Sequence, residues 1–312
     1  MIFERSLKRG RSHAGLPVRQ SRFFLERLNL LNPNTTQDKV RVPDFARMKA
    51  QHQPITMLTA YDFPFAKIFD HCGVDALLVG DSLAMVIRGE ESTLAVTIDE
   101  VIYHARAVVR ARRRALVVAD MPFLSYQVSP EEALRNAGRL VKEGGAEAVK
   151  LEGGIAIAET VRRISAVDIP VMGHIGLTPQ SIHRMGGHRV QGRTSGRAPG
   201  CRERLIEDAL ALEAAGAFAI VVEGVPPSLA REISRRVTVP TIGIGAGPDC
   251  DGQVLVMHDM LGLGETTPPR FAKPFANLWN DAAAAATAYV REVKTMAFPA
   301  PEHCYRENRR SQ

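Results

Sequence analysis

The segment Ala-Val-Lys-Leu-Glu-Gly-Gly at residues 148–154 combines the apolar pattern of a buried strand with two opposite charges. Lys150 and Glu152 stand two residues apart, so in an extended strand both side chains leave the same face. Burying either charge alone would cost several kcal/mol of folding free energy. The two side chains therefore need each other, a metal ion or a charged ligand.

Three further strand-like runs also end at an acidic residue. They cover residues 76–80, 115–119 and 218–222, and they lead into Asp81, Asp120 and Glu223. In a parallel barrel the carboxyl ends of all strands meet on one rim, where acids from distant parts of the chain come together. The recurrence of this pattern favours such a barrel, with its catalytic groups on that rim.

Strand and helix patterns alternate along the rest of the chain. The predicted strands cover residues 55–60, 76–80, 115–119, 148–151, 171–175, 218–222, 241–244 and 254–257. The predicted helices cover residues 43–49, 63–72, 98–112, 130–143, 157–165, 202–215 and 227–236. This alternation favours the α/β class and a (β/α)8 TIM barrel over an open doubly wound sheet. A long C-terminal helix within residues 275–295 is expected to close the barrel.

Composition places the protein among ordinary globular chains. Of its 312 residues 45% are apolar, which is enough for a substantial core. No segment offers the roughly 20 consecutive apolar residues of a membrane-spanning helix. The four cysteines form no Cys-x-x-Cys pair, which argues against a zinc ribbon or a disulfide scaffold and indicates a reducing compartment. We therefore expect a cytoplasmic protein with no membrane partner.

Most of the net charge of +6 lies in the N-terminal arm. Residues 1–37 hold seven basic and two acidic residues, a net charge of +5. We interpret residues 1–42 as a basic, flexible extension outside the core, residues 43–303 as the catalytic barrel and residues 304–312 as a polar tail. An Arg-rich, acid-poor N-terminus is also typical of a transit peptide, which would place the protein in mitochondria. Basic arms can bind nucleic acid, but we expect no nucleic-acid partner.

The acids at the strand ends favour a hard metal ion. Asp81, Asp120 and Glu152 offer only oxygen ligands, with no histidine cluster at zinc spacing, and such a set suits Mg²⁺. Each aspartate taken alone could instead cap a helix N-terminus. Lys150 could hold an anionic group of a substrate, or form a plain salt bridge with Glu152. Glu223 could act as a base if partial burial raised its pKa toward neutrality.

Six segments give the chain a close resemblance to a known family. They are Gly-Asp-Ser-Leu at 80–83, Ala-Asp-Met-Pro-Phe at 119–123, Val-Lys-Leu-Glu-Gly-Gly at 149–154, Gly-His-Ile-Gly-Leu-Thr-Pro-Gln at 173–180, Val-Gln-Gly-Arg at 190–193 and Ile-Gly-Ile-Gly-Ala-Gly at 242–247. In collinear order, from about residue 42 to residue 303, the sequence resembles the ketopantoate hydroxymethyltransferase family of pantothenate synthesis.

This resemblance implies a reaction, a metal and a donor. The expected reaction is transfer of a hydroxymethyl group from 5,10-methylenetetrahydrofolate to C3 of 3-methyl-2-oxobutanoate, giving 2-dehydropantoate on the route to coenzyme A. The expected metal is Mg²⁺, the expected fold a (β/α)8 barrel, and the expected assembly a homodecamer.

The resemblance also assigns roles to residues. It implies that Asp81, Asp120 and Glu152 surround Mg²⁺. It implies that the 2-oxo acid is held by Asp81, Ser82, Asp120 and Lys150. Glu223 would be the proton acceptor, and His174 is the next candidate for that role and a further residue that could line the site.

The sequence departs from the family pattern in three places. The first forty or so residues have no counterpart in typical members, Ala84 replaces a usual glycine, and Gly224 follows Glu223 where cysteine or another small residue is found. None of these departures removes a predicted ligand. Two alternatives stay open: another Mg²⁺-dependent 2-oxo-acid lyase or aldolase on the same barrel, and a catalytically silent barrel that works as a binding scaffold with its basic arm.

Overall fold

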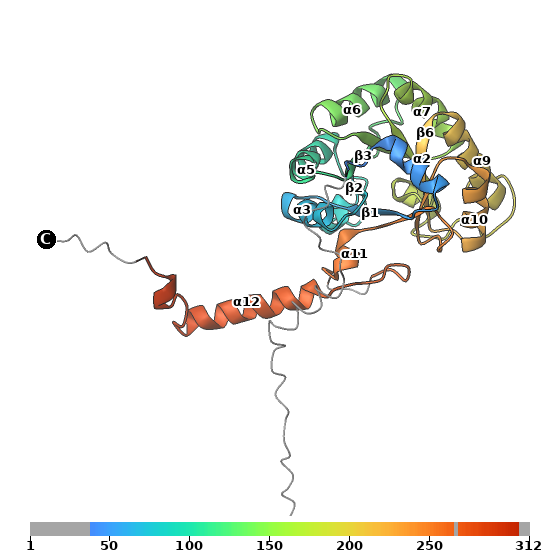
Figure 1. Ribbon diagram of the computed structural model, residues 1–312. Coiled ribbons are helices and arrows are strands. Elements are labelled where there is room, and N and C mark those ends of the chain that lie inside the picture. Colours follow the sequence, from blue (N-terminus) through green and yellow to red (C-terminus); the bar gives the residue numbers. More distant parts are fainter. Residues whose placement is uncertain (1–37, 265–267, 306–312) are drawn as a thin grey trace, which may run out of the picture. The chain divides into compact units, whose positions relative to one another are not determined.

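A closed barrel of eight parallel strands forms the centre of the protein (Figure 1). The computed structural model describes residues 38–264 and 268–305. The strands are β1 Ile55–Thr59, β2 Ala76–Val79, β3 Leu116–Asp120, β4 Ala148–Glu152, β5 Val171–Gly176, β6 Ala217–Glu223, β7 Thr241–Ile244 and β8 Gly252–Leu255. Consecutive strands pair in order, and β1 pairs with β8, with Ile55 opposite Gly252. The predicted (β/α)8 TIM barrel is confirmed.

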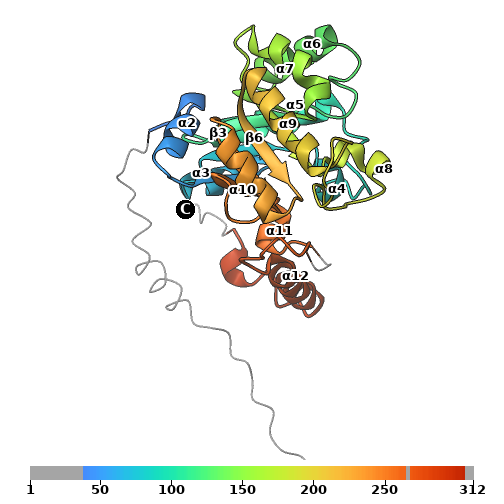
Figure 2. The same ribbon diagram turned by 90° about the vertical axis from the view of Figure 1, so that its right-hand side faces the viewer.

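Helices alternate with the strands and cover the outside of the barrel (Figures 1 and 2). The covering helices are α3 Phe63–His71, α5 Ile98–Ala111, α6 Pro130–Lys142, α7 Ala158–Ser165, α9 Arg202–Ala214 and α10 Pro227–Arg236. Their starts follow local sequence signals. Thr97 and Glu100 form a capping box at α5, and Ser129 caps α6 ahead of Pro130 in the first turn.

Short helical segments lie in the connections on the carboxyl side of the strands. They are α4 Leu83–Val86, η1 Ile155–Ile157, η2 Pro179–Ser181, α8 Ile182–Met185 and α11 Met257–Leu261. Figure 2 shows α4 and α8 at the end of the barrel opposite α2 (Val42–Ala50). Two of these segments, α4 and α8, therefore mark the rim on which the sequence predicts the acids.

The barrel interior is apolar toward the amino ends of the strands. The inward-facing buried residues there include Ile55, Met57, Ala76, Leu78, Leu116, Val118, Ala148, Met172, Ala219, Val221, Ile242, Ile244 and Val254. Phe45 of α2 is fully buried in the same cluster and packs edge-on against Phe218, with 5.4 Å between ring centroids. Helix α2 thus seals the amino end of the barrel, and polar groups are left to the carboxyl end.

The structure differs from the sequence prediction at two element boundaries. Strand β8 begins at Gly252 and ends before the predicted 254–257 run does, because Met257 already begins α11 and its backbone N–H donates to Thr59 Oγ1 at 2.9 Å. The folded part also begins before residue 43, since Val40 lies in the core and its N–H donates to Arg114 O. The rest of the predicted extension, residues 1–37, and residues 306–312 of the predicted tail lie outside the described residues.

The predicted long C-terminal helix is present as α12, Leu278–Lys294, and it is followed by the single turn η3, Pro301–His303. The expectation that it closes the barrel is wrong, because none of its residues is buried and the pairing of β1 with β8 closes the sheet. In the part of the chain that the structure describes, no helix is both long enough and apolar enough to cross a bilayer.

Candidate active site

One cavity at the carboxyl end of the barrel gathers the predicted site residues. It has a volume of about 410 Å³. Its lining includes all six of them: Asp81, Ser82, Asp120, Lys150, Glu152 and Glu223. Apolar side chains from the barrel interior, among them Val221, Ile244 and Val254, also line it. The cavity therefore combines a cluster of charges with an apolar surface.

The alternation of strand side chains brings the charges together. Lys150 and Glu152 both point into the barrel from β4, as their spacing of two residues predicts. Strand register then places Asp120 of β3 beside Lys150, and Glu152 beside His174 of β5. Each of these positions faces a charged or polar neighbour on the next strand, so the polar layer is continuous across three strands.

Lys150 forms its ion pair with Asp120. The distance from Lys150 Nζ to Asp120 Oδ1 is 2.8 Å, and both side chains are at most 5% exposed. The simple salt bridge between Lys150 and Glu152 that the sequence left open is therefore wrong. Burial alone would lower the pKa of Lys150, but the charges of Asp120, Glu152 and Asp81 outweigh it and raise that pKa. Lys150 is a buried ammonium group that faces the cavity.

His174 lies between two carboxylates. Its Nδ1 is 3.3 Å from Glu152 Oε1 and its Nε2 is 3.2 Å from Glu223 Oε2. Burial and the charge of Lys150 lower its pKa, but the hydrogen bonds to Glu152 and Glu223 outweigh them and raise it to about 9. His174 Nδ1 also lies 3.3 Å from Lys150 Nζ. The position of His174 among these groups confirms that it lines the site.

The aspartates do not cap helices. Asp120 Oδ2 accepts the backbone N–H of Asp81 at 3.0 Å, and α4, which follows Asp81, has no side-chain cap. The helix-capping alternative is therefore wrong for both residues. Burial, together with the charges of Asp120 and Glu152, raises the pKa of Asp81 well above its usual value. Crowding of carboxylates in this buried cavity therefore works against the ionised form of Asp81.

Three polar residues of the site were missed by sequence reasoning. Gln180, buried in η2, donates from Nε2 to Asp81 Oδ2 at 2.8 Å. Tyr126 Oη lies 2.7 Å from Gln180 Oε1, and Tyr61 Oη lies 2.8 Å from Ser82 Oγ. Gln180 follows a strand within the motif at 173–180, and its place after a strand end could have revealed it. No comparable signal marks the two tyrosines.

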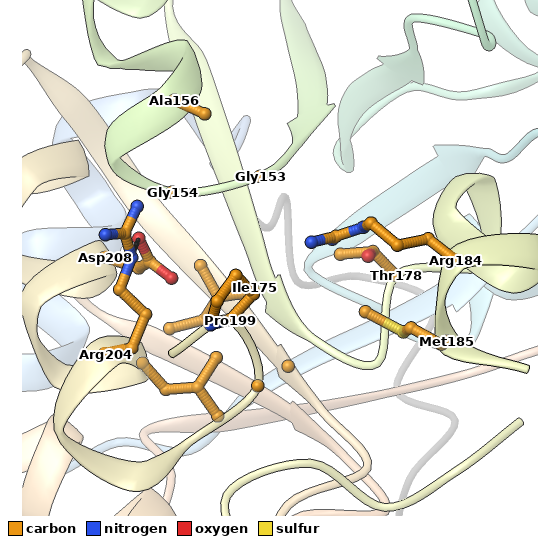
Figure 3. Close-up of a pocket in the computed structure, with 13 residues that line it drawn as sticks. Gly153, Gly154, Ala156, Ile175, Thr178, Arg184, Met185, Pro199, Arg204 and Asp208 are labelled. Atoms are coloured by element: carbon orange, nitrogen blue, oxygen red, sulfur yellow. Dashed lines mark hydrogen bonds and ion pairs between the residues drawn. The ribbon is translucent and has the colours of Figure 1, made fainter. Parts of the chain in front are cut away.

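A smaller cavity of about 200 Å³ lies beside the rim (Figure 3). Gly153, Gly154, Arg184, Arg204 and Asp208 are among its lining residues, and none of the six predicted site residues is. A Cβ atom on Gly154 would lie 2.0 Å from the Asp208 carboxyl carbon, which explains the glycine at this close approach. This cavity lies at the turn that follows β4 and is separate from the charged cluster.

Solved structures share the fold. A phosphonopyruvate hydrolase solved in complex with oxalate and Mg²⁺ aligns with a TM-score of 0.54 at 12% identity, covering 85% of this chain and 93% of that one. A 2,3-dimethylmalate lyase of the PEP mutase/isocitrate lyase superfamily aligns with a TM-score of 0.53 at 15% identity, covering 85% and 91%. At these identities the likeness supports the barrel and no more.

Sequence comparison identifies the family. The 3-methyl-2-oxobutanoate hydroxymethyltransferase of Pelobacter propionicus is 58% identical over 267 residues, covering 86% of this chain and 97% of that protein. The enzyme of the same name from Geobacter metallireducens is 55% identical, covering 86% and 98%. The family model described as ketopantoate hydroxymethyltransferase matches residues 39–301. The resemblance seen in the sequence motifs is confirmed, and the chain belongs to the ketopantoate hydroxymethyltransferase family.

Proposed function

We propose that the protein transfers a hydroxymethyl group from 5,10-methylenetetrahydrofolate to C3 of 3-methyl-2-oxobutanoate, giving 2-dehydropantoate for pantothenate and coenzyme A synthesis. The names of the relatives support this reaction. The structural observation that carries the proposal is the single cavity that joins Glu223 to Lys150 and three further acids above an apolar wall. Such a cavity suits a small, branched 2-oxo acid whose C3 proton has to be removed.

We further propose that Asp81, Asp120 and Glu152 hold Mg²⁺. All three offer oxygen, which this ion prefers. Asp120 Oδ1 is buried and accepts no well-aligned hydrogen bond. A bound cation would also offset the burial that, together with the charges of Asp120 and Glu152, raises the pKa of Asp81. Among the described residues no group of three possible ligands already stands at metal-binding spacing. We therefore expect the free oxygens of these side chains to turn toward the ion when it binds.

The side chains of the cavity have distinct parts in the proposed mechanism. Bound Mg²⁺ would polarise the 2-oxo group and make the C3 proton more acidic. The ammonium of Lys150 neutralises the substrate carboxylate, and Ser82, held by Tyr61, donates a hydroxyl toward the same end of the substrate. Val221 and Ile244 offer apolar contact to the branched alkyl group.

Glu223 is the proposed base. Its side chain is 14% exposed and lines the cavity, and its Oε2 lies 3.2 Å from His174 Nε2. Glu223 takes the proton from C3, and the electron pair of the broken C–H bond forms the new C–C bond to the one-carbon unit of the donor. Over the whole reaction one water molecule supplies the hydroxyl of the hydroxymethyl group. The two C–N bonds that held the one-carbon unit break, and the nitrogens of the released tetrahydrofolate take up one proton from water and one that replaces the C3 proton. The protonated Glu223 returns to its starting state when the proton leaves to solvent.

Deuterium exchange at C3 tests the proposed function. In D₂O, NMR is expected to show loss of the C3 proton signal of 3-methyl-2-oxobutanoate when the protein and Mg²⁺ are present, and much slower loss when a chelator is added. Addition of 5,10-methylenetetrahydrofolate is expected to convert the substrate to 2-dehydropantoate. Exchange without any folate-dependent product would favour the lyase or aldolase alternative, and the absence of exchange would favour the silent scaffold.

The assembly and the compartment are also proposed. We propose a homo-oligomer, a homodecamer by family resemblance, because α12 has no buried residue while Trp279, Tyr289 and Val293 on it are 41–60% exposed. A second copy of the chain is the partner that would cover such a helix. We propose the cytoplasm as the compartment, since all four cysteines are free thiols.

Light scattering tests the assembly. The full chain is expected to have the mass of about ten protomers in solution, as the family resemblance implies, and a chain that ends at Ala276 is expected to have a markedly lower mass, because it lacks the exposed apolar residues of α12. Circular dichroism of the shortened chain checks that its barrel stays folded. A monomeric full chain would contradict the proposal.

A further inference from the structure

The buried amide of Gln180 links two acids that come from different strands. Building on the proposed function, we propose that Gln180 is a positioning residue: it ties Asp81 to Glu152 and sets the spacing at which these carboxylates receive a divalent cation. The two acids follow β2 and end β4, so they are not neighbours in the sheet. Gln180 makes a direct hydrogen bond to each of them.

The contact to Asp81 uses the side-chain amide. Gln180 Nε2 donates to Asp81 Oδ2 at 2.8 Å and to Met121 O at 3.0 Å. An amide nitrogen has two hydrogens, so both are used and the group cannot rotate without losing a bond. Asp81 Oδ1 is left free of Gln180. The acid is thus held by one oxygen while the other can accept a cation.

The contact to Glu152 uses the backbone. Gln180 N donates to Glu152 Oε2 at 2.9 Å, and the other oxygen, Glu152 Oε1, faces His174 at 3.3 Å. Glu152 is also anchored on its far side, because the turn after it packs against Asp208, as Figure 3 shows at Gly154. A single residue therefore fixes one oxygen of each of two candidate ligands.

Tyr126 holds Gln180 in place. Its Oη lies 2.7 Å from Gln180 Oε1, 2.9 Å from Glu152 O, and accepts the N–H of Glu152 at 3.1 Å. The hydroxyl has one proton and can donate it to only one of these two acceptors at a time, so it joins the side chain of Gln180 to the backbone of β4 in either case. Tyr126 is fully buried and Gln180 is 7% exposed. The network is therefore shielded from water.

A neutral amide suits this position better than a charged group. A lysine or arginine here would neutralise Asp81 and compete with a cation for it. A carboxylate would add a further negative charge beside Asp81, Asp120 and Glu152, which line one cavity. The amide donates hydrogen bonds without changing the net charge. It can therefore bring Asp81 and Glu152 to a fixed separation and still leave their charge available to a metal.

Binding of Mn²⁺ to the full-length protein tests this role without any turnover. Mn²⁺ prefers the same oxygen ligands as Mg²⁺, and electron paramagnetic resonance measures the free ion. Gln180→Met keeps the length of the side chain and removes its donors, so we expect Mn²⁺ to bind about 10–100-fold more weakly, the usual loss when a residue that orients a ligand is replaced. The melting temperature, by circular dichroism, checks the fold.

Gln253→Met is the matched control. Gln253 is exposed on β8, and its amide donates to Gly247 O at 3.0 Å rather than to Gln180 or to an acid of the site. The same substitution there is expected to leave Mn²⁺ affinity within about two-fold of the wild-type value. In Gln180→Met, saturating Mg²⁺ is expected to restore most of the C3 exchange rate, because the variant lacks order in the ligands and not the base.

Three results would overturn the proposal, and they can be told apart. If the wild-type protein binds no Mn²⁺, the metal assignment in the proposed function fails and this inference fails with it. If the wild type binds and a folded Gln180→Met binds equally well, only the role of Gln180 is refuted. If Gln180→Met does not fold, Tyr126→Phe decides, since it removes one hydroxyl that holds Gln180; unchanged Mn²⁺ affinity in that variant would refute the role.

Discussion

Glu223→Gln is expected to slow C3 exchange by roughly 10²–10⁴-fold, the usual contribution of a positioned general base. Glutamine keeps the size of the side chain and can still accept a hydrogen bond from His174, which lies 3.2 Å from Glu223 Oε2. It cannot take up the proton. Binding of 3-methyl-2-oxobutanoate and of Mg²⁺ is therefore expected to stay close to the wild-type level.

The measurement for Glu223→Gln separates chemistry from binding. NMR gives the exchange rate at saturating substrate, and calorimetry gives the substrate affinity. Glu131→Gln, an exposed carboxylate on α6 that pairs with Arg163, controls for a general effect of the substitution. If Glu223→Gln exchanges at nearly the wild-type rate, Glu223 only braces the site and the proton acceptor has to be sought elsewhere on the rim.

Asp120→Asn is expected to lower Mg²⁺-dependent exchange by about 10²–10³-fold, equivalent to a loss of about 3–4 kcal/mol of transition-state stabilisation. The variant keeps an oxygen for the N–H of Asp81, which now donates to Asp120 Oδ2 at 3.0 Å, so the rim is expected to stay folded. It removes the charge that pairs with Lys150 and would face the metal. Both substrate holding and metal affinity are therefore expected to fall.

A titration of the exchange rate with Mg²⁺ checks the Asp120→Asn result. A ligand role predicts that the half-saturating Mg²⁺ concentration rises, while the melting curve by circular dichroism shifts little. Asp259→Asn is a suitable control, because Asp259 lines the same cavity and is not a proposed ligand. An unchanged Mg²⁺ dependence in Asp120→Asn would exclude Asp120 as a ligand.

The parts of the site that follow strand periodicity could be predicted from the sequence. Lys150 and Glu152 stand two residues apart in a β-strand, so their common direction depends on local geometry alone. The acids Asp120 and Glu223 end their strands, and in a parallel barrel all such ends share one rim. Local pattern and global topology agree at these positions, which is why both the fold and the charged cluster could be recognised.

Other parts depend on contacts that no local pattern records. Gln180 and Tyr126 meet across 54 residues of sequence, and their bond depends on how two rim connections pack. Met257 was assigned to a strand because it is apolar, but its N–H is taken by Thr59, 198 residues away. The helix α12 itself is predicted correctly from its sequence. What its exposed apolar side chains pack against cannot be predicted from that sequence, because it depends on another surface.

Helix α2, which closes the amino end of the barrel, also determines the side from which molecules reach the cavity. Phe45 fills the base of the barrel, so within residues 38–264 and 268–305 the cavity is reached from the carboxyl end. Under the proposed function two molecules of very different size, the 2-oxo acid and the folate donor, would enter by this one route. The small 2-oxo acid is expected to bind deeper, beside Lys150, and a bulky pterin bound at the entrance would block its path. We therefore expect ordered binding, in which the acid enters first and the spent donor leaves before the product.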